Sequence, residues 1–179
     1  RSIELLTKQT FDKLNKNIFD KIINIFSKWD LSTDKNNINA ALPILVFGRL
    51  LDMESEDITD KMIADNISIS TDFLLKHHNK LDVRWGDINK LIRGNEILEL
   101  SGGPDISRAI YTKKEKNGML KATAGDCYIL LVRWDNKGKV FSESIHQYGS
   151  ATKNKESIHY DDQAKLFSQN KLKKTSIYI

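Results

Sequence analysis

The stretch Cys127–Trp134, CYILLVRW, constrains the fold more than any other part of the chain. Its apolar side chains fall on both alternating faces, which is typical of a central β-strand covered on both sides. Residues 136–138, Asn-Lys-Gly, form a hairpin-turn signal, and Val140–Ile145 has the pattern of the returning strand. The sequence therefore predicts an antiparallel sheet in the second half of the chain.

The first part of the chain has the periodicity of an amphipathic helix instead. Apolar residues recur at steps of three and four positions; they are Leu6, Phe11, Leu14, Ile18, Ile22, Ile25 and Trp29. This spacing predicts a helix of about seven turns, with Ser2 as a candidate N-cap. A polar turn is expected over residues 30–37, DLSTDKNN.

A second helix is expected from Ala40 through Leu51. It is apolar on most sides and should be deeply buried, and Pro43 fits best in its first turn. The acidic stretch 52–65 follows and is expected to be a solvated surface connection, because its spacing lacks the pattern of a calcium loop.

A third helix is expected over Thr71–Leu81, with Ser70 as its cap. His77 and His78 are adjacent, so they point to different helix faces and are expected to be surface or packing residues. Further along, the expected elements are a short helix over Asp87–Arg93 closed by Gly94, strands and turns from Glu96, a short helix at Leu166 and Phe167, and a last strand over Ser176–Ile179.

Helices followed by an antiparallel sheet indicate an α+β fold. We expect residues 1–82 to form a helical segment and residues 83–179 to form a sheet segment, with no Pro/Gly-rich linker between them.

Composition excludes several classes of protein. A chain of 179 residues with 40% hydrophobic and 29% charged residues can bury a core, so disorder is not expected. A net charge of +4 does not suggest nucleic acid binding, and the basic run at Lys171, Lys173 and Lys174 is expected to be a solvated edge. No window approaches the ~18 apolar residues of a membrane span. Because Arg1 leads directly into a helical pattern, we expect a piece of a longer protein.

Residue types suited to nucleophilic catalysis occur in the second half. Cys127, the single cysteine, could act with His146 and Asp126, although a cysteine that opens an apolar strand is expected to be a buried small hydrophobe. Ser144 and Ser150 are weaker candidates, because no Gly-x-Ser-x-Gly elbow surrounds either of them.

A metal site is an alternative use of the histidines. His146, His159, Asp161 and Asp162 lie close in sequence and could bind zinc or manganese if they converged. Their spacing matches no known metal-binding motif in which a helix or a hairpin would bring the ligands together.

Gly102 and Gly103 are expected to supply unusual backbone angles for a turn before Pro104. A dinucleotide loop is not supported, because the chain has no strand–GxGxxG–helix unit. No cofactor is expected.

Four motifs in order cover about half of the chain: VRWGDINKLIRG from Val83, LSGGPDISRAIY from Leu100, ATAGDCYILLVRWD from Ala122, and SESIHQYGSATKNKESIHYDDQAKLF from Ser142. In order and spacing they resemble the end of the β chain in the penicillin acylase family. The similarity is greatest to the branch of aculeacin-type and acyl-homoserine-lactone acylases.

This resemblance implies a fold and a chemistry. Family members are precursors that cut themselves into an α and a β chain, and the new N-terminal residue of β is the nucleophile, with its own α-amino group as the base. The implied fold is a four-layer αββα sandwich. None of the catalytic groups maps onto this chain, so the nucleophile and the oxyanion-binding groups would lie upstream. By the same resemblance, His146, His159, Tyr160, Asp162, Gln163, Gly102 and Gly103 are expected to be structural.

Three functional hypotheses follow. The first is a C-terminal fragment of an exported amidohydrolase, periplasmic or secreted, that cleaves the N-acyl side chain of a homoserine lactone, a lipopeptide or a β-lactam. Its roles would be quorum quenching or antibiotic biosynthesis, and its partner would be the remainder of the same precursor. The second is a non-catalytic binding or assembly module. The third is a metal-dependent hydrolase that uses His146 and His159.

Overall fold

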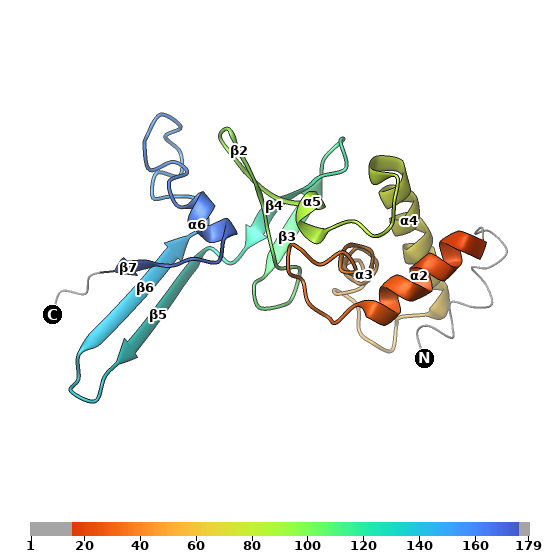
Figure 1. The fold of residues 1–179 in the computed structure, drawn as a ribbon, viewed down its shortest axis with the longest axis horizontal. Helices are drawn as coiled ribbons and strands as arrows, with labels where there is room; N and C mark the ends of the chain where they lie inside the picture. Colours follow the sequence, from red (N-terminus) through yellow and green to blue (C-terminus); the bar gives the residue numbers. More distant parts are fainter. Residues whose placement is uncertain (1–15, 176–179) are drawn as a thin grey trace.

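The computed structural model of the protein describes residues 16–175. These residues form an elongated molecule with helices at one end, a four-stranded sheet in the middle and a protruding β-hairpin at the other end (Figure 1). None of the helices in residues 16–175 is long and apolar enough to span a membrane.

Helix α2, Lys16–Lys28, confirms the helical periodicity of the first part of the chain. It buries Phe19, Ile22 and Ile25 on one face, as the three- and four-residue spacing requires. The part of the expected helix before Lys16, with its proposed Ser2 cap, lies outside the described residues.

Helix α3, Ala41–Phe47, confirms the buried second helix and places Pro43 in its first turn. It ends earlier than expected, so Leu51 lies in the following turn and is exposed. The aromatic ring of Phe47 packs against α2, edge-on to Phe26 at 5.9 Å and stacked on Trp29 at 6.4 Å.

Helix α4, Asp60–His78, is longer than the helix predicted over Thr71–Leu81. Thr59 is the N-cap, since its side chain accepts a hydrogen bond from the Met62 amide. The predicted cap Ser70 is instead a buried residue within the helix. The prediction was wrong because a serine is a common N-cap residue, and this local preference was given more weight than the apolar spacing. That spacing runs from Ile63 through Leu74 without a break at Ser70, so the helix continues across it.

His77 and His78 are packing residues, as expected. The His77 ring lies 5.0 Å from the Phe73 ring, and His78 Nε2 lies 3.4 Å from the Gly118 carbonyl oxygen. A Cβ at Gly118 would come within 2.5 Å of His77. Only glycine therefore lets this hairpin turn approach α4 so closely.

The segment predicted as a helix over Asp87–Arg93 is mostly a strand. One short turn, α5 (Trp85–Ile88), leads into β1, Asn89–Arg93. Its partner is β2, Glu96–Glu99, and Gly94, at φ 59°, lies in the hairpin between them rather than capping a helix. Pairing with β2 provides hydrogen-bond partners for the backbone N–H and C=O groups of this segment. These strand contacts outweigh the local helical pattern.

A four-stranded sheet forms the middle of the molecule, in the order β2-β1-β4-β3. Strands β3, Ile110–Lys114, and β4, Leu120–Gly125, form an antiparallel hairpin, and β1 runs parallel to β4. The sheet is therefore mixed, not purely antiparallel.

A second sheet contains β5, Tyr128–Trp134, β6, Val140–His146, and β7, Lys173–Thr175, in that order and antiparallel. The hairpin predicted around residues 136–138 is confirmed, with Trp134 paired to Val140. The expected last strand over Ser176–Ile179 lies outside the described residues.

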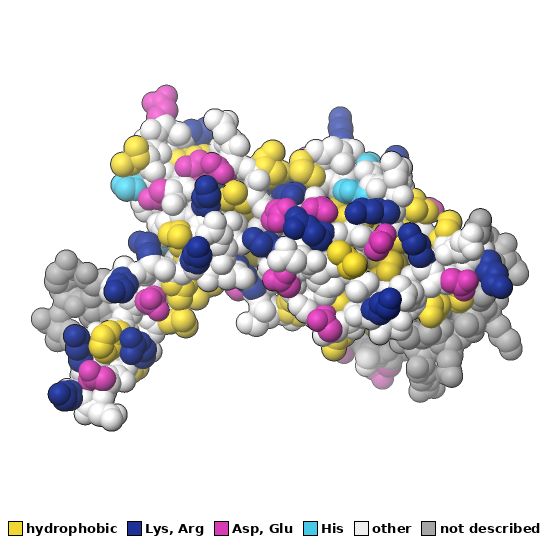
Figure 2. Space-filling view, viewed as in Figure 1, with side chains coloured by type: hydrophobic (Ala, Val, Ile, Leu, Met, Phe, Trp, Pro, Cys, Tyr) yellow, Lys and Arg dark blue, Asp and Glu magenta, His cyan; other side chains and the backbone are white. Residues whose placement is uncertain are grey.

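Strand β5 is not covered on both sides, contrary to the prediction. Within the described chain it lies at the edge of its sheet, and Leu131 and Trp134 are 56% and 66% exposed. Figure 2 shows hydrophobic side chains at the surface of this arm among lysines and arginines. An apolar pattern indicates that a strand is suited to burial. It does not show which other segments would cover that strand.

Two apolar clusters hold the molecule together. The larger contains α2, α3 and α4 residues together with Trp85, Ile88 and Leu120. The smaller contains Leu91, Leu100, Ile110, Ile145, Ala164 and Phe167, and so ties α6, Ala164–Ser168, to both sheets. Helix α6 confirms the short helix expected at Leu166 and Phe167. The mixed helix and sheet content is compatible with an α+β fold.

Candidate functional site

The loop between β6 and α6 contains four of the sequence-predicted site residues. His159 Nδ1 lies 2.9 Å from Asp162 Oδ2, and both side chains are partly exposed. Gln163 Oε1 accepts a hydrogen bond of 3.1 Å from the His146 amide, which joins the loop to the end of β6. These contacts fix the path of the chain.

Gly149 is the tightest point of this loop. A Cβ at Gly149 would come within 2.1 Å of the His159 carbonyl oxygen and 2.5 Å of Asp162 Oδ1. The two limbs of the loop therefore meet only because this residue has no side chain.

Arg93 organises the same loop from β1. Its guanidinium carbon lies 3.6 Å from the Tyr160 ring centroid and 4.5 Å from that of Tyr148. It also donates to the carbonyl oxygens of Tyr160 at 3.2 Å and Thr152 at 2.8 Å. This pairing of a planar cation with two rings is stabilising. Sequence reasoning missed Arg93, because nothing in the sequence shows that β1 lies beside residues more than 50 positions away.

The Gly102–Gly103 turn joins the helical part to the sheet. Gly102 adopts φ 104°, and its carbonyl oxygen accepts a 2.7 Å hydrogen bond from Trp85 Nε1. A Cβ at Gly102 would come within 2.6 Å of the Arg108 carbonyl oxygen. Gly103 is not among the positive-φ glycines, so the expectation of unusual angles is right for Gly102 and wrong for Gly103.

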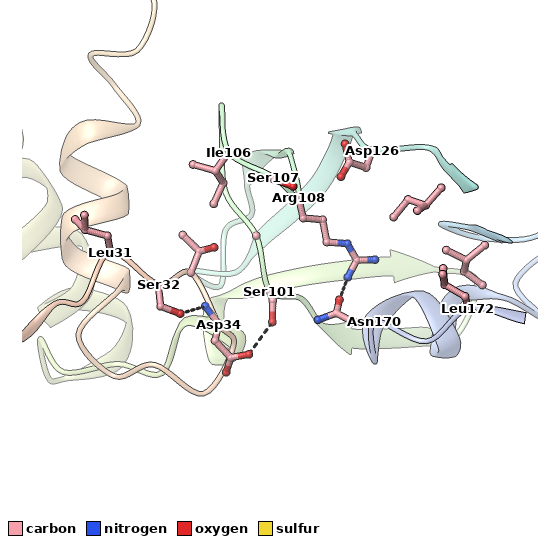
Figure 3. A pocket seen from close by; sticks show the side chains of 14 residues that line it. Leu31, Ser32, Asp34, Ser101, Ile106, Ser107, Arg108, Asp126, Asn170 and Leu172 are labelled. Carbon is pink, nitrogen blue, oxygen red and sulfur yellow. Dashed lines mark hydrogen bonds between the residues drawn. The ribbon is translucent and has the colours of Figure 1, made fainter. Parts of the chain in front are cut away.

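A hollow of about 640 Å³ lies between this turn, the 31–34 loop and the segment after α6 (Figure 3). Arg108 crosses it, stacked 3.8 Å over the Phe167 ring and donating to the Phe167 carbonyl oxygen and to Asn170 Oδ1. Burial lowers the pKa of Arg108, and the charge of Asp126 opposes that shift. Across the hollow, Ser101 Oγ donates to Asp34 Oδ2 at 3.3 Å. Some polar groups of the hollow therefore already bind one another, whereas the buried Arg108 Nε has no hydrogen-bond partner among residues 16–175.

The cysteine and serine candidates are not assembled into a triad within residues 16–175. Cys127 is exposed, so the expectation of a buried cysteine is wrong. The His146 ring instead packs 4.7 Å from the Tyr128 ring. Ser144 Oγ bonds Thr175 Oγ1 at 2.7 Å within the sheet, and Ser150 lies on an exposed loop.

The candidate metal ligands do not converge in the described part of the chain. Among residues 16–175, no group of three or more His, Cys, Asp or Glu side chains is placed to hold a metal ion. His159 has Asp162 beside it, whereas His146 faces Tyr128.

Two comparisons with known proteins bear on the identity of the chain. The family model described as penicillin amidase matches residues 4–178. Acyl-homoserine lactone acylase PvdQ from Pseudomonas fluorescens is 28% identical over 92 residues, which are 50% of this chain and 12% of that protein. This chain is thus similar to a small part of a much longer relative. Since the family model covers nearly the whole sequence, the chain belongs to the penicillin amidase family.

Proposed function

We propose that this chain is the C-terminal segment of an amide hydrolase and that it serves as framework for the remainder of the same precursor. The family match and the name of its relative support amide hydrolysis as the activity of the whole protein. The coverage of only 12% of that relative supports a role as one part of a larger protein.

The observation that carries this proposal is the exposed apolar strand β5. Its sequence has the pattern of a strand buried on both faces, yet Tyr128, Leu130, Leu131 and Trp134 are exposed in the described chain. Large exposed apolar side chains on an unpaired strand edge favour association with another segment. The remainder of the precursor would cover this face and pair with the edge of β5 that has no partner strand among residues 16–175.

In the proposed whole protein, an N-terminal nucleophile outside this chain attacks the carbonyl carbon of a linear amide. The amine leaves, and water then releases the acyl group as a carboxylic acid. The substrate would be an N-acyl homoserine lactone, a lipopeptide or a β-lactam with an acyl side chain. The protein would be processed by self-cleavage and exported to the periplasm or beyond. This segment alone would be inactive.

The test is to capture the endogenous protein with an antibody against this segment and to determine its intact mass and N-terminal residue. A β chain much larger than 20.5 kDa that begins with Ser, Cys or Thr and carries a bound second chain is expected. A chain that begins near Arg1 and binds nothing would contradict the proposal and would leave a non-catalytic module as the function.

A further inference from the structure

A second hollow, of about 380 Å³, lies on the helical side of the four-stranded sheet. We call it the Trp85 hollow. It is formed by Trp85 with Ile44 and Leu45 of α3, Ile110 of β3 and Leu120 of β4, and Pro104 closes one side. All but Pro104 are buried apolar residues. The volume lies within the range of about 300–1,000 Å³ that is usual for small-molecule sites.

Two cations border this apolar floor. Arg49 follows α3, and Lys114 ends β3, so the two side chains come from different elements. Among residues 16–175, neither forms a salt bridge with a carboxylate. Lys114 Nζ lies 4.5 Å over the Phe73 ring, which holds it against α4. Two cations without a carboxylate partner beside an apolar hollow favour an anion.

The electrostatics of Lys114 agree with this geometry. Its pKa is lowered, first by burial and then by the charge of Arg49. An anion between them would relieve that repulsion. Among residues 16–175, no carboxylate lines the hollow, and the hydroxyl of Tyr111, which does line it, donates to Asp105 Oδ1. A charged ligand would therefore be oriented with its anionic end toward Arg49 and Lys114.

We propose that the Trp85 hollow binds a small amphiphilic anion, with its acidic group between Arg49 and Lys114 and its apolar body in the hollow. The site is separate from the β5 face and does not depend on the proposed function. It selects for one negative charge joined to an apolar body of limited size.

The test is a titration of the ¹⁵N-labelled 179-residue chain with octane-1-sulfonate, followed by the indole N–H signals in NMR spectra. The chain contains three tryptophans, Trp29, Trp85 and Trp134. Only Trp85 lines the hollow, and Trp134 reports on the β5 arm. A saturable shift of the Trp85 signal, with Trp134 unchanged, is expected. A shift confined to Trp134, or no saturable shift, would overturn the proposal.

Ligand controls separate charge from hydrophobicity. Octan-1-ol and methanesulfonate each lack one half of the proposed ligand, and octyltrimethylammonium carries the opposite charge. All three are expected to bind much more weakly than octane-1-sulfonate. Equal binding of octyltrimethylammonium would contradict a role for the two cations.

Variants assign the anionic end. Arg49→Gln and Lys114→Gln should each weaken binding roughly tenfold, since each removes one charge-assisted contact. Lys113→Gln is the matched control, because Lys113 is the neighbouring exposed residue of β3 and does not line the hollow. All three residues lie at the surface, and only part of the Lys114 side chain is buried, so the spectra should remain those of a folded chain. Unchanged affinity in both Arg49→Gln and Lys114→Gln would refute the site.

Discussion

The helical end and the β5–β6 arm carry similar apolar sequences but differ in what covers them. At the helical end, α2, α3 and α4 surround a shared cluster in which Ile22, Leu42 and Leu74 are fully buried. In the arm, Leu130, Leu131 and Trp134 of β5 remain exposed. The comparison teaches that an apolar pattern shows which residues are suited to burial, and that within residues 16–175 only the helical end buries them.

The largest expected effect is loss of stability at the helical end. Leu74→Ala removes a fully buried side chain and should lower the free energy of unfolding by about 2–5 kcal/mol, because a cavity is left behind. Leu131→Ala should change it by less than about 0.5 kcal/mol, because this side chain is exposed. Urea denaturation of both variants measures the difference. A similar loss in both would show that the two ends are equally packed.

Association with the rest of the precursor should depend on the β5 face and not on the helical end. Leu131→Lys places a charge on the proposed β5 face and should weaken association with the rest of the precursor by about tenfold or more, as expected for a central apolar contact. Co-expression and co-purification of the two parts measure this.

Ile97→Lys is the control for that experiment. Ile97 lies on β2, another edge strand, and is 56% exposed, the same fraction as Leu131. Association should therefore be retained in this variant. If both substitutions abolish assembly, general surface charge rather than the β5 face is responsible.

A smaller effect is expected at the loop that joins the arm to α6. Gly149→Ala forces a Cβ against the His159 carbonyl oxygen and should lower stability by about 1–3 kcal/mol, with faster hydrogen exchange in the loop. Gly138→Ala, where no atom lies within 4 Å but φ is 79°, should lower it by only about 1 kcal/mol. Equal losses would contradict the prediction that the close approach at Gly149 costs more than the positive φ at Gly138.

The smallest expected effect is on the pH dependence of stability. Because the pKa of Lys114 is lowered in the folded chain, the unfolded state binds more protons in the interval just below 10.5, and this group makes stability rise with pH there. Tyr111 acts oppositely, since its hydrogen bond to Asp105 raises its pKa above 10.0.

Comparison of the wild-type chain with Lys114→Gln isolates the lysine contribution, because Tyr111 is common to both. The wild-type chain should gain stability relative to the variant as pH rises toward 10.5, measured by denaturation at a series of pH values. A constant difference between the two proteins would contradict the prediction.

Local patterns predicted much of the fold. The spacing of Ile18, Ile22 and Ile25 predicts the exposed and buried faces of α2, and the Asn-Lys-Gly turn predicts the β5–β6 hairpin. Each of these depends on residues within one or two turns of the chain. The errors in the helix assignments occurred at Ser70 and over Asp87–Arg93, where a local signal competed with packing or with pairing to a distant strand.

The candidate site depended more strongly on contacts between distant residues. His159, Asp162 and Gln163 were singled out from the sequence, but Arg93 was not, although it stacks on Tyr148 and Tyr160. Arg49 and Lys114 are likewise far apart in the sequence, and no local pattern indicates that they lie beside the same hollow.

The sequence by itself determined the family of this protein, the order of helices before sheets and the β5–β6 hairpin, because each is specified by short motifs and near neighbours. The tertiary structure alone decided that residues 89–93 are a strand, that β5 is exposed within residues 16–175, and that two cations border one apolar hollow. The physical reason is that burial, pairing and charge proximity depend on which distant segments meet, and local periodicity carries no information about that.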